Sequence, residues 1–173
     1  MLSGSDFLPP RWLRSPHLQS ILASSPWRPR RGAQALAAIG ASSEAYLVDG
    51  GDGIRLQGLF SRVRGGGQRG LALLLHGWEG SSESSYMRLT AARLLACGFE
   101  TFRLNFRDHG ETHHLNEGIF HSGRIDEVVH AARDIGSRFT DRPMVVAGYS
   151  LGGNFALRLA LRAPAAGIAL SRV

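Results

Sequence analysis

The sequence predicts an α/β fold, with a mainly parallel sheet that carries helices on both faces. Three observations predict it. Short apolar runs alternate along the chain with segments of helical periodicity. The apolar runs are too short for full helices and lack strict alternation, which is typical of strands buried on both faces. The chain has 173 residues, of which 43% are hydrophobic, enough for one core.

An antiparallel hairpin is expected before the alternating part. Residues 44–48 and 54–60 are extended segments, and the five residues between them are Asp49, Gly50, Gly51, Asp52 and Gly53. Such a run of Asp and Gly is a strong turn signal. Further strands are predicted at 70–76, 99–105, 143–149 and 167–170.

Two amphipathic helices are predicted between these strands. The first carries apolar residues at i, i+4, i+7 and i+8, and Gly98 ends it. The second has acidic and basic residues opposite its apolar face, and Asp134 and Arg138 are spaced to pair. The apolar positions are Met87, Ala91, Leu94 and Leu95 in the first, and Ile125, Val128, Val129, Ala132, Ile135 and Phe139 in the second. A third helix follows Ser150 and is expected to end before Pro164.

Residues 1–43 are interpreted as an N-terminal docking leader with little regular pattern, and residues 44–173 as the domain. Large apolar side chains gain free energy on burial, so we expect Trp12, Leu18 and Ile21 to pack on the domain.

Composition narrows the function classes. The net charge is +6 and all 20 basic residues are arginine, but they are scattered and form no nucleic-acid-binding motif. We therefore expect no nucleic-acid partner. No apolar run is long enough to span a membrane, so no transmembrane segment is predicted. The single cysteine, Cys97, is expected to be a small core residue, and a cytoplasmic location follows from the lack of disulfides and of a signal peptide.

The pattern G-x-S-x-G occurs as Gly148–Gly152, between a buried strand and a helix. A serine on such a tight turn has its hydroxyl clear of the sheet, which defines a nucleophile elbow. Side chains at Gly148 and Gly152 would clash, because the chain on either side passes close to Ser150. The helix that follows directs its N-terminal amides at the same point, where negative charge is stabilised.

A histidine-rich loop at 107–122 could suggest a metal site. Its spacing matches no recognised metal motif, so we expect no metal and no cofactor. The candidate ligands in this loop are Asp108, His109, Glu111, His113, His114 and His121.

These features resemble the α/β-hydrolase superfamily, and more narrowly the YheT-like branch of bacterial carboxylesterases. The resemblance is carried by residues 9–19 (PPRWLRSPHLQ), 75–82 (LHGWEGSS), 105–107 (NFR), 121–123 (HSG) and 148–154 (GYSLGGN). One departure is the run from Asp108 to Glu111, where that branch often has a Gly-Cys-Ser-Gly-like turn.

The resemblance implies a serine hydrolase acting on a small-molecule carboxylic ester. Ser150 would be the nucleophile, and the amides of Leu151 and Trp78 would stabilise the oxyanion. His76 would support the loop at Gly77 rather than act as the base.

In this fold the chain order is Ser, then Asp or Glu, then His. The residues after Ser150 include no Asp, no Glu and no His. We therefore expect the N-terminal part of a hydrolase, truncated after the nucleophile helix and the start of the next strand, and inactive alone. The open sheet edge at 167–170 would favour self-association. Two alternatives stay open: a non-catalytic fragment or binding module, and an upstream base such as His113 or His114.

Overall fold

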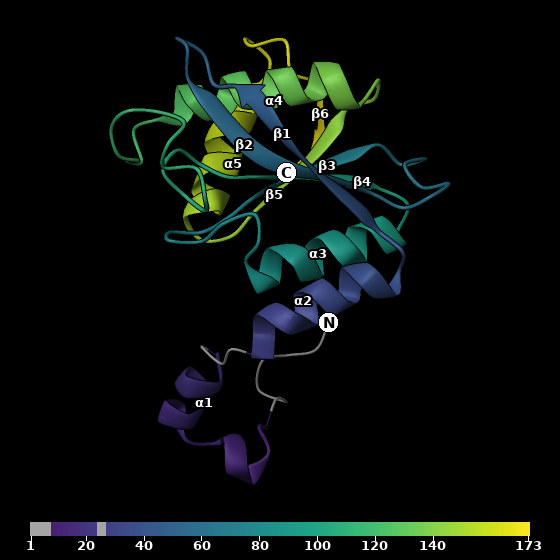
Figure 1. The fold of residues 1–173 in the computed structure, drawn as a ribbon, viewed down its shortest axis with the longest axis vertical. Helices are drawn as coiled ribbons and strands as arrows, with labels where there is room; N and C mark the ends of the chain where they lie inside the picture. The colour runs from purple at the N-terminus through teal and green to yellow at the C-terminus, as the bar shows by residue number, and fades with distance from the viewer. Residues whose placement is uncertain (1–7, 24–26) are drawn as a thin grey trace.

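A computed structural model describes residues 8–23 and 27–173. In that part of the chain six strands form one sheet, in the order β1-β2-β4-β3-β5-β6 (Figure 1). The strands are β1 (Ser42–Asp49), β2 (Arg55–Arg62), β3 (Leu71–Leu75), β4 (Glu100–Leu104), β5 (Met144–Gly148) and β6 (Leu170–Arg172). The β1–β2 and β2–β4 pairs are antiparallel, and the other pairs are parallel. The predicted mainly parallel sheet with a hairpin is confirmed.

The turn of the hairpin is closed by its own polar groups. The Asp49 carboxylate accepts a hydrogen bond from the Gly51 N–H at 2.8 Å. The Ile54 N–H donates to the Gly51 carbonyl, also at 2.8 Å. Positive φ angles at Gly51, Asp52 and Gly53 explain the choice of Gly and Asp. This turn lies at the carboxyl end of β4, because Gly58 pairs with Leu104.

Helices cover both faces of the sheet, as predicted (Figure 1). They are α2 (Trp27–Ala38), α3 (Ser85–Ala96), α4 (Ile125–Phe139) and α5 (Leu151–Arg162). Alternate residues of β3 divide between two cores: Leu73 faces the larger core with α4 and α5, and Leu74 faces the smaller one with α3. All five residues of β3 are buried, which explains its continuous apolar sequence.

The core helices follow the predicted periodicity. Gly98 ends α3 with a φ of +87°. In α4 the buried residues are Ile125, Val128, Ala131, Ala132 and Ile135. The predicted pair between Arg138 and Asp134 is present at 3.0 Å.

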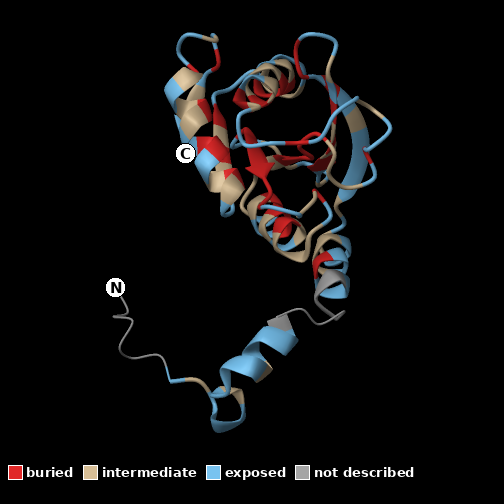
Figure 2. Cartoon of the chain, turned by 90° about the vertical axis from the view of Figure 1, so that its left-hand side faces the viewer, coloured by how far each residue is buried: buried red, intermediate tan, exposed pale blue. Residues whose placement is uncertain are grey.

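The leader differs from the prediction in structure and in its anchors. Residues 1–7 and 24–26 lie outside the described part. Instead of an irregular segment, the leader contains α1 (Pro16–Ala23) and α2. The predicted anchors Trp12 and Ile21 are 65% and 68% exposed, and Leu18 is only partly buried. Most of α1 is exposed (Figure 2). The segment contacts the domain through α2, where Leu36 packs against the core of Leu74, Met87 and Ala91.

Glycine explains why α2 makes this contact. A Cβ at Gly32 would lie 2.8 Å from the Cβ of Arg88, so the absence of a side chain allows α2 to approach α3 closely. The predicted start of the last strand, β6, needs correction. It begins at Leu170, not at residue 167, because Gly167 adopts a φ of +68° in the turn that follows α5.

In the described ranges, the helices are all too short or too polar to cross a membrane.

Candidate active site

Ser150 lies on the sharp turn between β5 and α5. Its φ of +53° and ψ of −115° are strained for a residue with a side chain. The turn is held by two backbone hydrogen bonds, from the Tyr149 N–H to the Leu75 carbonyl at 3.1 Å and from the Gly152 N–H to the Tyr149 carbonyl at 2.9 Å. Ser150 is exposed, so its hydroxyl is available to a ligand.

The two glycines of the motif are required by close backbone contacts. A Cβ at Gly148 would lie 2.1 Å from the carbonyl oxygen of Gly152. A Cβ at Gly152 would lie 2.3 Å from the carbonyl oxygen of Leu75. Both distances are far below van der Waals contact, so the first turn of α5 is pressed against the carboxyl end of β3. The predicted reason for these glycines agrees with the geometry.

The loop after β3 lies directly beside Ser150. A Cβ at Gly77 would be 3.4 Å from the Cβ of Ser150 and 3.2 Å from the Tyr149 carbonyl oxygen. The next residues form a tight turn, closed by the Gly80 N–H donating to the Gly77 carbonyl at 3.0 Å. Glu79 occupies the position with positive φ, at +54°, which is usually taken by glycine. The turn therefore fixes Trp78 next to the residue that contacts Ser150.

His76 braces this loop. The Phe106 N–H donates to its Nε2 at 3.2 Å, so the proton is on Nδ1, which donates to the Gly77 carbonyl at 2.8 Å. The side chain is fully buried. Burial is the main reason why the pKa of His76 is lowered to about 4; the hydrogen bond to Gly77 opposes this shift, and the nearby His109 adds to it. His76 is therefore neutral near pH 7, with both ring nitrogens committed to backbone groups, which suits the predicted supporting role.

Two polar residues to which the sequence analysis gave no role in the site hold it together. The hydroxyl of Tyr86 accepts a hydrogen bond from the Gly77 N–H at 3.0 Å. Asn105, at the end of β4, accepts from the Ser82 N–H at 2.6 Å. A polar residue directly after a buried strand was the available signal for Asn105. Tyr86 lacked such a signal, because it contacts the loop only through the tertiary fold.

The predicted oxyanion donors belong to two segments that meet at Ser150, the start of α5 and the loop after β3. Leu151 is the first residue of α5, so its N–H has no partner four residues earlier within that helix. Trp78 follows Gly77, the residue in contact with Ser150. Their service as oxyanion donors stays a prediction.

The histidine-rich loop is anchored on α4 by a buried ion pair. The Arg107 guanidinium donates to the Glu127 carboxylate at 2.7 and 3.2 Å, and to the Glu117 carbonyl at 2.6 Å. Arg124 donates to the same carboxylate at 3.0 Å. Because both members of the Arg107–Glu127 pair are largely buried, the pair fixes the loop firmly.

Two histidines of this loop, His109 and His113, line a cavity of about 410 Å³ beside Trp78. His113 Nδ1 lies 2.5 Å from the Asp108 carboxylate. Ser150 is not among the residues that line this cavity. His114 is exposed. Across the described residues, the histidines, cysteine and acids form no group of three or more that could hold a metal ion.

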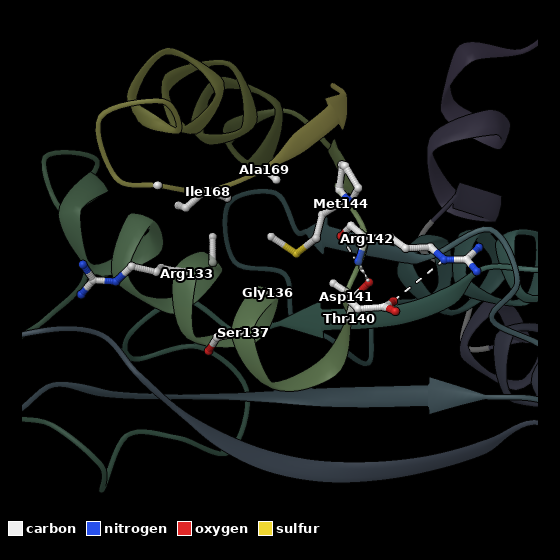
Figure 3. Close-up of a pocket in the computed structure, with 12 residues that line it drawn as sticks. Arg133, Gly136, Ser137, Thr140, Asp141, Arg142, Met144, Ile168 and Ala169 are labelled. Atoms are coloured by element: carbon white, nitrogen blue, oxygen red, sulfur yellow. Dashed lines mark hydrogen bonds and ion pairs between the residues drawn. The ribbon is translucent and has the colours of Figure 1, made fainter.

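A second cavity, of about 480 Å³, lies at the opposite end of the sheet (Figure 3). It is lined by the end of α4 and by the residues that precede β5 and β6. Met144 points into it, whereas Arg133 and Arg142 point away. Ligands of open α/β sheets bind outside the carboxyl ends of the strands, where Ser150 lies, and not at this end.

The chain belongs to the α/β-hydrolase family. The family model for the alpha/beta hydrolase fold matches residues 72–169, more than half of the chain. The search of curated proteins found no sequence that matches this chain.

Solved structures of esterases share the fold. The Pyrococcus furiosus esterase Pf2001 aligns with a TM-score of 0.60 and 20% identity, over 71% of this chain and 48% of its own. A bacterial heroin esterase aligns with a TM-score of 0.62 and 21% identity, over 90% and 55%. Esterase Est22 aligns with a TM-score of 0.64 and 17% identity, over 89% and 49%. The chain thus spans about half the length of these esterases, and at such identities the likeness shows the fold alone.

Proposed function

We propose that this chain is the nucleophile-bearing part of a serine esterase that acts on a small-molecule carboxylic ester. The observation that carries the proposal is the strained Ser150, held at +53° on a strand-to-helix turn by two glycines that leave no room for a Cβ. Strain of this kind costs free energy and is typical of functional sites. The esterase names of the structural neighbours support the reaction class. Membership of the YheT-like branch and a cytoplasmic location belong to the same proposal.

In the proposed reaction a base takes the proton of the Ser150 hydroxyl while Oγ forms a bond to the ester carbonyl carbon. The carbonyl electrons move to oxygen, and the Leu151 and Trp78 amides stabilise that oxyanion. The oxyanion then collapses and expels the alcohol, which takes the proton from the base. Water then attacks the acyl-enzyme carbonyl while the base takes its proton, and collapse of the second oxyanion releases the carboxylic acid and returns the proton to Ser150. His76 is not this base, because both its nitrogens are committed to backbone groups.

We infer that the acid and the base come from residues outside these 173. The residues after Ser150 contain no Asp, Glu or His, and the family places both partners after the serine. A serine hydroxyl is a weak nucleophile without a base. The 173-residue chain should therefore hydrolyse p-nitrophenyl esters no faster than its own Ser150→Ala variant.

The test compares this chain with a longer form that continues through a downstream acid and histidine. A fluorophosphonate probe should label the longer form at Ser150, and Ser150→Ala should abolish the labelling. Ser122→Ala, in an exposed loop, serves as the matched control and should label normally. If the probe labelled the longer form at a residue other than Ser150, the esterase proposal would be wrong.

The competing idea of an upstream base makes a different prediction. If the short chain labels at Ser150 and loses the label on His113→Ala or His114→Ala, then the base lies within this chain. The inference of an external acid and base would then be wrong, while the esterase assignment would stand.

A further inference from the structure

The cavity beside Trp78 is lined by acidic, histidine and aromatic side chains that have no role in the proposed reaction. Its volume is about 410 Å³, enough for a substituent the size of a benzene ring with a short tail. It opens next to the loop that contacts Ser150, since Trp78, Glu79 and Gly80 line it. The remaining lining residues are Asp108, His109, Gly110, His113, Ile119 and Phe120.

Apart from its two histidines, the ionisable residues that line this cavity are acidic. Glu79 and Asp108 bring two carboxylates, and none of the nine lining residues is an arginine. This contrasts with the chain as a whole, which carries 20 arginines against 14 acids. The acidic lining of the cavity is therefore opposite in sign to the molecule's net charge of +6.

The two histidines add acceptors to the same walls. His109 Nδ1 lies 2.8 Å from the Arg107 carbonyl, which can only accept, so Nδ1 carries the proton. His113 Nδ1 lies against the Asp108 carboxylate and is fixed in the same way. In each neutral imidazole the lone pair is then on Nε2, the nitrogen left to a ligand.

Aromatic rings complete the cavity. Trp78 is 61% exposed, so much of its ring surface is open to a ligand. Phe120 holds it in place, with ring centroids 6.1 Å apart, and packs edge-on against His109 at 4.9 Å. A tryptophan face is the aromatic surface that attracts cations best.

We propose that this cavity is a subsite for a protonated amine, so that the preferred esters carry an ammonium group on an aromatic or short apolar substituent. The ammonium would lie against Trp78 and between the Glu79 and Asp108 carboxylates, donating to Nε2 of His109 or His113. The substrate-class part of this proposal rests on the proposed esterase function, whereas the amine site itself does not.

The test measures binding alone, by isothermal titration calorimetry or ligand-observed NMR at pH 7.5, with the 173-residue chain. The two probes are 2-phenylethylammonium and 2-phenylethanol, which match in shape and differ in charge. We expect the amine to bind roughly tenfold more tightly than the alcohol. The double variant Glu79→Gln/Asp108→Asn should bring the ratio close to one. Glu111→Gln removes a charge from the same loop outside the cavity and should leave the ratio unchanged.

Equal affinities, no binding of either probe, or a ratio that survives the double variant would overturn the subsite. Glu79→Gln alone, at an exposed part of the turn, gives a second reading should the double variant fail to fold. Because no turnover is measured, a failed labelling experiment at Ser150 would leave the amine site standing. Likewise, esterase activity without any amine preference would remove the subsite and leave the proposed function.

Discussion

Single atoms decide the geometry around Ser150. At Gly148 and Gly152 the space where a Cβ would lie is already filled by backbone oxygens at 2.1 and 2.3 Å. Backbone cannot move aside as a flexible side chain can. These glycines therefore fix both the approach of α5 to β3 and the strained conformation of the serine between them.

We predict opposite effects for two alanine substitutions that lie five residues apart. Gly148→Ala should lower the free energy of unfolding by about 3 kcal/mol or more, because the new methyl group overlaps the Gly152 carbonyl. Gly153→Ala, whose Cβ would meet its nearest neighbour at 3.4 Å, should raise it by about 0.5–1 kcal/mol through helix propensity. Urea unfolding at one pH measures both. A tolerated Gly148→Ala would contradict the description of the elbow.

His76 predicts how stability depends on pH. Its pKa falls from 6.5 to about 4 on folding, so the unfolded chain binds the proton more readily. The contribution of neutral His76 is complete above pH 6.5 and is lost as the pH falls toward 4. Within this window the free energy of unfolding should fall by up to about 1.4 kcal/mol for each pH unit.

The measurement is urea unfolding of the wild type and His76→Gln at pH 7.5, 6 and 5. The variant loses the histidine proton and keeps an amide that can accept from Phe106, so its stability should vary less with pH. A variant with the same slope as the wild type would show that other groups cause the dependence.

Among the elements, α2 shows how a helix outside the predicted domain becomes part of it. It packs on α3 through Gly32 and Leu36, whereas α1 lies apart from the sheet in both views of the chain (Figures 1 and 2). The apolar residues that looked like anchors, Trp12 and Ile21, contribute little burial. The prediction from large apolar residues therefore placed the docking contact in the wrong part of the leader. The close approach of two helices depends on small residues such as Gly32 as much as on large ones.

We predict that the leader stabilises the domain through α2 and not through Trp12. Leu36→Ala should lower the free energy of unfolding by about 1–2 kcal/mol, since a half-buried side chain leaves the core of Leu74 and Met87. Trp12→Ala, which removes a larger but exposed side chain, should change it by less than about 0.5 kcal/mol. Thermal unfolding of the pair decides this, and a larger effect at Trp12 would support the original docking prediction.

At the scale of the whole molecule, α5 keeps apolar surface exposed and β6 is an edge strand. Leu157 and Leu161 lie one turn apart on α5 and are 68% and 80% exposed. Among the strands of the described residues, β6 pairs with β5 alone, so its other side presents open backbone groups. Both features favour contacts between molecules.

We therefore predict concentration-dependent self-association of the 173-residue chain in sedimentation velocity. The double variant Leu157→Lys/Leu161→Lys should shift the distribution toward the monomer, because it charges the exposed face of α5 without touching the buried Phe155 and Leu159. Leu89→Lys is the matched control, since Leu89 is 44% exposed on α3 and belongs to the opposite face of the sheet. Equal effects of both changes would indicate a general response to charge.

The sequence by itself determined the α/β class, the hairpin, the core helices and the position of Ser150 on a strand-to-helix turn. These features depend on local periodicity and on glycines whose backbone geometry is specific, so neighbouring residues suffice to predict them. The tertiary structure alone decided the docking of α2, the support of Gly77 by Tyr86, and the placing of Asp108, His109 and His113 around a cavity with Trp78. Such contacts join residues that are distant in the chain, and their energy depends on the packing of whole elements, which no local pattern records.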